Sequence, residues 1–314
     1  MKHSFNKVWC LGRVRTSYYQ SYVTTIVHLS GEDFAPPPLQ PNRNRLMKIS
    51  SSFLLQLFAV SSREEGMPIW GGANHQHGPV GHAGGPTTPT RPRLTYFAGW
   101  GLAEQTRWVM AACDVEWDQV ALASHGEFAS LRDGDVLAFG QLPLLEIDGL
   151  RLVQSQAIVR YVARRGGLLA GGGGGGDAAE SATIDMVAEA VRDARSGLTA
   201  YPFSIDGPAH AAECRAKLLG KQLPYLEAAL RRGGGTVVPS GLSYADVLIA
   251  EMLEGYIGLL GHGLIDELPW LKALRDRVLA LDGVAKYLTS DRRYPFPRGE
   301  VGRAYVANVN AVLH

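Results

Sequence analysis

The stretch that most constrains the fold is residues 141–165, which read QLPLLEIDGLRLVQSQAIVRYVARR. Its first part, Leu142–Ile147, is a short apolar run with turn residues on both sides, a pattern typical of a β-strand. The dipeptide Asp148-Gly149 tolerates positive φ angles and predicts a two-residue hairpin turn. Leu150–Gln154 is then expected to be the returning strand of that hairpin.

A helix is expected directly after the hairpin. Ser155 is a suitable N-cap, because its side-chain oxygen can accept a hydrogen bond from a free backbone N–H of the first turn. Ile158, Tyr161 and Val162 follow at helical spacing. The start of a helix carries unpaired N–H groups and a partial positive charge. The polar pair Gln154-Ser155 therefore predicts a binding position for a carboxylate or a phosphate.

The residues before this stretch complete a small α/β domain. Leu94–Phe97 and Trp117–Leu122 read as strands, and Ala103–Cys113 between them reads as a helix. A loop containing Arg132–Asp135 leads to the central stretch. The order strand, helix, strand, hairpin and helix predicts a thioredoxin-like domain over residues 91–167.

The residues after this domain predict a linker and then a second domain. Residues 168–176 include the glycine run Gly171–Gly176 and are expected to form a flexible linker. Residues 177–314 predict an all-helical bundle domain, in which Ser243 and Asp246 form a capping box. The expected helices are Ala178–Leu198, Ala209–Arg231, Tyr244–Tyr256, Leu268–Leu281, Val284–Thr289 and, last, Glu300–Leu313.

The composition excludes several classes of protein. A net charge of +1 gives no electrostatic case for binding nucleic acid or an anionic membrane. No apolar run reaches the ~20 residues that span a bilayer. The length and the 46% hydrophobic content allow roughly two domains with cores of their own. The cysteines are far apart and predict neither a disulfide framework nor a zinc site; they are Cys10, Cys113 and Cys214.

Residues 1–90 are expected to be a disordered leader, because they contain tracts rich in Pro, Gly and Thr. Two targeting interpretations compete with disorder. No acidic residue precedes Gly31, as in organellar transit peptides, whereas the apolar run after Met47 resembles a secretory signal. A gene model that begins too far upstream would explain the leader equally well. His75, His77 and His82 have metal-ligand spacing, but a Gly/Pro tract offers no fixed geometry, so no metal site is expected.

Nearly the whole chain after the leader resembles the tyrosine-type glutathione transferases, most closely the alpha and sigma classes. Gln141-Leu142-Pro143 is similar to the family's Gln-x-Pro, and Gln154-Ser155 to its Gln-Ser before the third helix. The resemblance implies a cis bond before Pro143 and backbone pairing of Leu142 with the cysteinyl part of glutathione. It also implies capture of the γ-glutamyl carboxylate by Gln154 and Ser155.

The same resemblance implies the substrates and the assembly. Glutathione would be the co-substrate, and a hydrophobic small molecule would be the electrophile. The protein would be a homodimer in the cytoplasm, or in an organelle if the leader is a targeting segment. Helix Glu300–Leu313 would cover the electrophile pocket or would be a packed tail.

Tyr96 is the expected catalytic residue. In the tyrosine-type classes, the tyrosine at the end of the first strand donates its hydroxyl to the sulfur of glutathione, and Thr95-Tyr96-Phe97 is similar to that strand end. A free thiol has a pKa near 8.5, so only a small fraction is the nucleophilic thiolate at neutral pH. The alternative interpretation is a strand tyrosine with a buried ring and a satisfied hydroxyl. Cysteine- or serine-type chemistry is not expected, because the turn Ala98–Glu104 contains neither residue.

One departure from the family affects the sulfur site. Where the family usually has Arg-Gly-Arg, this chain has Trp100-Gly101-Leu102. The second arginine often helps to polarise the sulfur site, so thiolate stabilisation is expected to be weaker here. Trp100 and Leu102 would instead form an apolar wall, although Trp100 also fits a partly exposed turn residue. The residues expected to line the electrophile pocket are Phe97, Trp100, Leu102 and Tyr305.

Three further residues are implied by the resemblance. Arg132 matches a basic residue for the glycine carboxylate of glutathione, and Asp193 matches an aspartate that reaches the γ-glutamyl ammonium across a dimer interface. Phe139 matches an aromatic residue that inserts into the partner subunit, with a place in the strand core as its alternative. The full set expected to bind glutathione is Tyr96, Arg132, Gln141, Leu142, Pro143, Gln154, Ser155 and Asp193.

Two other functions use the same fold. A glutathione-dependent isomerase or peroxidase, for example of the prostaglandin type, would keep the glutathione site and differ in the second pocket. A protein that binds glutathione or another ligand without catalysis is the remaining alternative, motivated by Trp100, Leu102 and the long leader.

Overall fold

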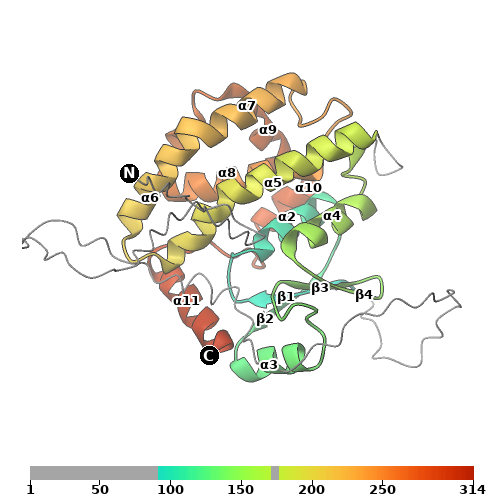
Figure 1. Cartoon of the computed structure of the whole chain (residues 1–314), viewed down its shortest axis with the longest axis vertical. Helices are drawn as coiled ribbons and strands as arrows, with labels where there is room; N and C mark the ends of the chain where they lie inside the picture. Colours follow the sequence, from blue (N-terminus) through green and yellow to red (C-terminus); the bar gives the residue numbers. More distant parts are fainter. Residues whose placement is uncertain (1–90, 171–176) are drawn as a thin grey trace, which may run out of the picture. The chain divides into compact units, whose positions relative to one another are not determined.

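The computed structural model describes residues 91–170 and 177–314. The predicted leader, its histidines and the glycine run lie outside the described residues. The predicted fold class is confirmed for the described part, because a mixed α/β unit is followed by a helical one (Figure 1). None of the helices in this part is both long and apolar enough to cross a membrane.

A four-stranded sheet forms the centre of the first unit, with the strand order β2-β1-β3-β4. β1 (Arg93–Phe97) pairs in parallel with β2 (Asp118–Leu122) and antiparallel with β3 (Leu144–Ile147). β3 pairs antiparallel with β4 (Leu150–Val153) through the hairpin predicted at Asp148-Gly149, where both residues have positive φ. The β1–β2 pair is parallel because helix α2 (Ala103–Ala112) connects the two strands across the sheet.

Two details of this unit differ from the sequence-based expectation. Arg132 and Asp133 belong to helix α3 (His125–Asp133), where a loop was expected. Ser124 caps that helix, with Glu127 as its reciprocal partner, and the short helix has too few apolar residues for a clear periodicity. Helix α4 (Ser155–Arg165) already contains Ser155, so the N-cap position belongs to Gln154, whose side chain makes no capping hydrogen bond. The N-cap assignment of Ser155 was therefore wrong by one residue.

The second unit is helical throughout, as predicted. Its helices are α5 (Ala178–Ala200), α6 (Gly207–Lys217), α7 (Leu223–Arg232), α8 (Tyr244–Leu260), α9 (Pro269–Leu279), α10 (Asp282–Leu288) and α11 (Gly299–Leu313), with short 3-10 turns η2 (Tyr201–Phe203) and η4 (His262–Ile265). The helix expected over Ala209–Arg231 is divided by the π-helical turn η3 (Leu218–Gln222). Pro224 explains the division, because proline lacks an N–H and its ring would clash with the carbonyl four residues earlier.

Helix α8 is the central helix of the second unit. It packs against α5, α9 and α2, and nearly all of its residues as far as Ile257 are buried. Its start is fixed by the predicted capping box. The buried Asp246 carboxylate accepts hydrogen bonds from the Ser243 N–H at 2.8 Å, the Ser243 hydroxyl at 2.6 Å and the Val237 N–H at 2.8 Å. Asp246 therefore joins the start of α8 to the loop that precedes it.

We predict that Asp246→Ala lowers the free energy of unfolding by about 3 kcal/mol or more, because it leaves several buried donors without an acceptor. Urea denaturation followed by circular dichroism measures this change. The matched control is Glu127→Ala in the exposed capping box of α3, where a loss of about 1 kcal/mol or less is expected because water can replace the acceptor. Equal losses in the two variants would contradict the prediction.

Candidate functional site

The sheet register brings three of the predicted site residues to one edge of the sheet. Thr95 is paired with Leu144, and Leu144 with Val153. The next residues beyond these pairs are Tyr96, Pro143 and Gln154, which therefore follow one another across β1, β3 and β4. Helices α2 and α4 both begin just after these strand ends, so their N–H-bearing starts lie at the same edge (Figure 1).

The segment from Gln141 to Pro143 has the geometry that the resemblance implied. The Leu142–Pro143 peptide bond is cis, and Pro143 is buried. The Gln154 side chain donates a hydrogen bond from Nε2 to Oε1 of Gln141 at 2.8 Å. Gln154 itself has a φ of 69°, a left-handed conformation that is uncommon for a residue with a side chain. Polar groups from both sides of the hairpin thus meet at the start of α4, beside the half-buried Ser155.

Tyr96 lies at the end of β1 with its ring buried and only 4% of the residue exposed. Its hydroxyl oxygen accepts a hydrogen bond from the Leu102 N–H at 3.0 Å. The Leu102 N–H belongs to the turn between β1 and α2, so this turn folds back over the hydroxyl of Tyr96. The oxygen of Tyr96 is therefore held at the start of α2, where a partial positive charge favours an anion.

Arg107 holds the first half of this turn. Its Nη1 donates to the Gly99 carbonyl at 3.1 Å and to the Trp100 carbonyl at 3.2 Å, and it pairs with Glu104 at 3.0 Å. Glu104 also accepts hydrogen bonds from Trp108 Nε1 and from the Tyr287 hydroxyl. Burial, with Glu104 as a second cause, raises the pKa of Tyr287, so this hydroxyl keeps its proton and donates it.

Arg195, from α5, holds the second half of the turn. It donates from Nε and Nη2 to both carboxylate oxygens of Glu251 at 2.8 Å, and Nη2 also reaches the Gly101 carbonyl at 2.8 Å. The guanidinium lies 4.0 Å from the ring centroid of Trp100. Burial raises the pKa of the Glu251 carboxyl, and the charge of Arg195 opposes that rise. Three consecutive carbonyls, from Gly99 to Gly101, are thus held by two buried arginines.

The residues expected to line the electrophile pocket cluster around the same turn. Trp100 is buried against Phe296 and Arg195, so the interpretation of a partly exposed turn residue was wrong. Phe97 contacts Tyr96 edge-on at 4.9 Å between ring centroids. Tyr305, on α11, is buried beside Phe203 and Tyr96, whereas Leu102 is half-buried.

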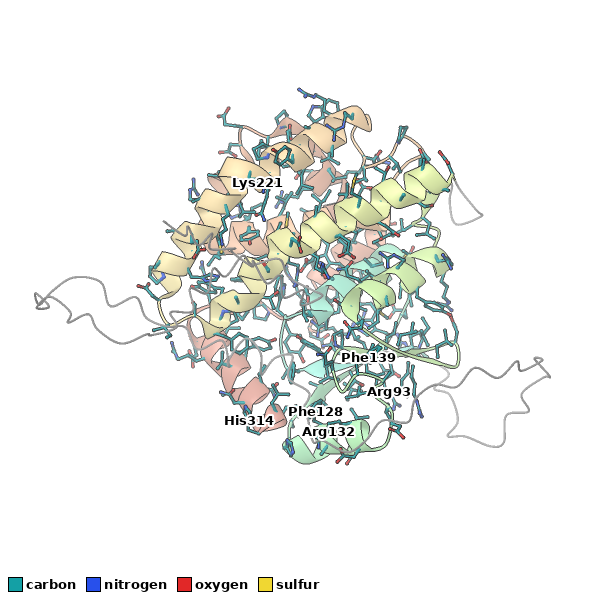
Figure 2. All side chains as sticks on the ribbon, in the orientation of Figure 1. Arg93, Phe128, Arg132, Phe139, Lys221 and His314 are labelled. Carbon is teal, nitrogen blue, oxygen red and sulfur yellow. The ribbon has the colours of Figure 1, made fainter. Side chains whose placement is uncertain are left out.

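The remaining predicted residues lie away from this cluster, on the surface. Figure 2 shows Arg132 and Phe128 on α3, with Phe139 on the segment that follows. Arg132 is exposed, pairs with Asp133 at 2.8 Å and lies 5.8 Å from the Phe128 ring centroid. Phe139 is 61% exposed, which rules out the alternative of a strand-core residue. Asp193 is exposed on α5 and pairs with Arg192 at 3.6 Å.

The two cysteine thiols of the described residues are held in their protonated form. Cys113 lies at the end of α2, and burial, with Asp114 as a second cause, raises the pKa of its thiol to about 12. Burial also raises the pKa of the Cys214 thiol. Within residues 91–170 and 177–314, no group of three or more His, Cys, Asp or Glu side chains is placed to hold a metal ion.

Comparison with known proteins identifies the family. Residues 92–164 match the glutathione S-transferase N-terminal domain, and residues 192–291 match the glutathione S-transferase C-terminal domain. Glutathione S-transferase alpha-5 of Rattus norvegicus is 38% identical over 212 residues, which cover 66% of this chain and 93% of the relative. The chain belongs to the glutathione S-transferase family. Its type is alpha-like, since glutathione S-transferase alpha-3 of Rattus norvegicus is also 37% identical, over 64% of this chain and 89% of that relative.

Solved structures of a glutathione S-transferase and of a prostaglandin synthase have the same fold as this chain. A Pi-class glutathione S-transferase of Onchocerca volvulus aligns with a TM-score of 0.55 and 29% identity, covering 63% of this chain and 92% of that one. Prostaglandin synthase D of Nilaparvata lugens aligns with a TM-score of 0.53 and 26% identity, covering 65% of this chain and all of that one.

The residues that hold the turn of this glutathione S-transferase were not predicted from its sequence. Arg107, Glu104, Arg195 and Glu251 form two buried ion pairs, each of which contacts the turn carbonyls through its arginine. One signal was present in the sequence. Glu251 has apolar residues on both sides in α8, Val247–Ala250 before it and Met252-Leu253 after it, and a carboxylate in such a buried run requires a partner.

We predict that Arg195→Met lowers the free energy of unfolding by about 3–5 kcal/mol, because the Glu251 carboxylate stays buried without a partner. The double variant Arg195→Met/Glu251→Met should recover most of this loss, because it removes both charges. Urea denaturation checks both expectations. The control is Lys217→Met, which breaks an exposed pair with Glu213 and should change the free energy by about 0.5 kcal/mol at most. A loss in Arg195→Met no larger than in this control would contradict the prediction.

Proposed function

We propose that this transferase conjugates the sulfur of glutathione to hydrophobic electrophiles, with Tyr96 as the residue that holds the sulfur as a thiolate. The observation that carries the proposal is the position of the Tyr96 hydroxyl. Tyr96 ends β1 at the sheet edge, where the register places it beside the cis-bonded Pro143, and the Leu102 N–H donates to its hydroxyl oxygen. An oxygen that already accepts a backbone hydrogen bond has its own proton available for a second acceptor.

The chemistry needs a thiolate, because the thiol form is a poor nucleophile. A hydrogen bond from Tyr96 to a charged sulfur contributes about 1.5–3 kcal/mol. If it acts on the thiolate alone, it lowers the pKa of the thiol by about one to two units. The partial charge at the start of α2 adds to this effect. Attack of the thiolate on an electrophilic carbon then forms the C–S bond of the product.

The rest of glutathione is proposed to lie along the sheet edge. Gln154 and Ser155, at the start of α4, would hold the γ-glutamyl carboxylate, where free N–H groups favour an anion. The backbone of Leu142 would pair with the cysteinyl part, next to Gln141. Arg132 would bind the glycine carboxylate in exchange for part of its contact with Asp133.

Phe97, Trp100, Leu102 and Tyr305 supply the apolar wall proposed for the electrophile. They surround the turn that carries the Leu102 N–H, so a bound electrophile would lie close to the sulfur. Holding both reactants in one place supplies much of the rate in such reactions.

We further propose a homodimer in which Asp193 of the partner subunit reaches the γ-glutamyl ammonium. Two exposed apolar side chains support an interface. Phe139 is 61% exposed after α3, and Met186 is 64% exposed on α5, the helix that also carries Asp193. Large exposed apolar side chains are costly in water and are enriched in interfaces.

We predict that Tyr96→Phe raises the pKa of the bound glutathione thiol by about one to two units, because the charged sulfur loses its hydrogen-bond donor. The conjugation rate at neutral pH should fall with it, while glutathione affinity changes little. Calorimetry and thiolate absorbance against pH measure the two quantities. The control is Tyr161→Phe, which removes a hydroxyl bonded to Asp148 in the same unit. Identical thiol titrations of wild type and Tyr96→Phe would leave Tyr96 with a structural role only.

We predict that Phe139→Ser shifts the protein from dimer to monomer, because it removes an apolar side chain from the proposed interface. Sedimentation velocity at several concentrations measures this shift. Ile205→Ser is the matched control, since Ile205 is 83% exposed and lies between η2 and α6. If both variants sediment as the wild type does, Phe139 is outside any interface.

A second function, glutathione-dependent isomerisation, is favoured by the likeness to the prostaglandin synthase D structure. It would use the same Tyr96 and glutathione site and would differ in the fate of the sulfur. An isomerase returns glutathione at the end of the cycle, whereas a conjugating enzyme consumes it. Measuring glutathione before and after complete conversion of a substrate separates the two.

A further inference from the structure

Tyr305 lies where it can act on Tyr96, although the two residues are far apart in the sequence. It belongs to the last helix, α11, and only 6% of it is exposed. A Cβ atom at Gly99 would overlap its ring, and a Cβ at Gly101 would lie 2.5 Å from both the Tyr305 hydroxyl and the Tyr96 hydroxyl. The absence of side chains at these two glycines therefore leaves room for the Tyr305 ring and for both hydroxyls beside the turn.

Helix α11 is fixed in this position by polar contacts with the first unit. One turn after Tyr305, Asn308 accepts a hydrogen bond from the Ala98 N–H at 2.8 Å and donates to the Leu122 carbonyl at 2.9 Å. Nδ1 of His125 lies 3.2 Å from the Val312 carbonyl oxygen near the end of the helix. Asn308 thus joins α11 to the ends of both β1 and β2. These contacts fix the position of Tyr305 relative to the turn between β1 and α2.

The protonation of Tyr305 makes it a hydrogen-bond donor. Burial is the main cause that raises its pKa, and the neighbouring Tyr96 raises it further. The positive charges of Arg107 and Arg195 act in the opposite direction but do not cancel the rise. A neutral hydroxyl has one proton to donate, and the oxygen of Tyr96 can accept it.

We propose that Tyr305 is a positioning residue that donates its hydroxyl proton to the oxygen of Tyr96. That oxygen then accepts two hydrogen bonds, one from Tyr305 and one from the Leu102 N–H. With both acceptor positions of the oxygen filled, the single proton of Tyr96 points to the sulfur of glutathione. Donation into the oxygen also polarises the Tyr96 O–H and makes it a stronger donor. This inference rests on the proposed function, in which Tyr96 holds the thiolate.

The test is a double-mutant cycle on the pKa of the bound glutathione thiol. Thiolate absorbance is titrated for the full chain, Tyr305→Phe, Tyr96→Phe and the double variant. Tyr305→Phe keeps the ring against Gly99 and Phe203 and should raise the thiol pKa by about 0.3–1 unit. The double variant should match Tyr96→Phe alone, because Tyr305 acts only through Tyr96.

A matched control removes a different buried tyrosine hydroxyl. Tyr256→Phe deletes the hydroxyl that donates to the Ala194 carbonyl on α5 at 2.6 Å. This variant is expected to lower stability and to leave the thiol pKa unchanged. A thiol pKa that shifts equally in Tyr256→Phe and Tyr305→Phe would mean a general effect of lost stability and would overturn the proposal.

Three further outcomes are decisive. An unchanged thiol pKa in Tyr305→Phe, beside a normal shift in Tyr96→Phe, overturns this proposal alone. Additive shifts in the double variant mean that Tyr305 acts directly on the sulfur, which also overturns it. Failure of the wild type to bind glutathione overturns the proposed function, and the role of Tyr305 with it.

Discussion

The two buried arginines that hold the turn between β1 and α2 are the constraint on which the site depends. Arg107 comes from α2 and binds the Gly99 and Trp100 carbonyls, whereas Arg195 comes from α5 and binds the Gly101 carbonyl. Each arginine is neutralised by its own buried glutamate. Such pairs contribute little net stability, because desolvation offsets most of their attraction. Their evident effect is geometric, since they fix the carbonyls of the turn so that the next N–H, that of Leu102, points at the oxygen of Tyr96.

Leu102 bears on how strongly the site stabilises a thiolate, and the expectation of a weaker stabilisation stays a prediction. In the sequence, the loss of the family's second arginine indicated a weaker sulfur site. In the structure, the guanidinium of Arg195 lies beside this turn. It comes from the helical unit and donates to the Gly101 carbonyl rather than into an open pocket. Arg195 also stacks on Trp100, which occupies the position of the family's first arginine in the tripeptide. The turn is held from both structural units, so it keeps all of these contacts only when the two units are packed together.

Local signals in the sequence predicted most of the elements, and long-range contacts account for what was missed. The turn at Asp148-Gly149 and the capping box of Ser243 and Asp246 each depend on residues a few positions apart, and both are present. Arg195 and Glu251 are separated by 56 residues, and no local pattern connects them. The convergence of Tyr96, Pro143 and Gln154 follows from strand register, which was not predicted. The resemblance to a known family supplied the cis bond before Pro143, which the residues alone would not have indicated.

Asn308 gives the last helix a double attachment, to the end of β1 and to the end of β2. The same helix places Tyr305 against Gly99 and Gly101 in the turn between β1 and α2. Under the proposed function, the helix that would line the substrate pocket is therefore mechanically coupled to the strand that ends in Tyr96. As a consequence of that proposal, substrate preference and the pKa of the bound glutathione thiol would not be independent traits in this protein. A sequence change that reshapes α11 for a bulkier substrate would then also move the groups around the sulfur, so selection on one property would act on the other.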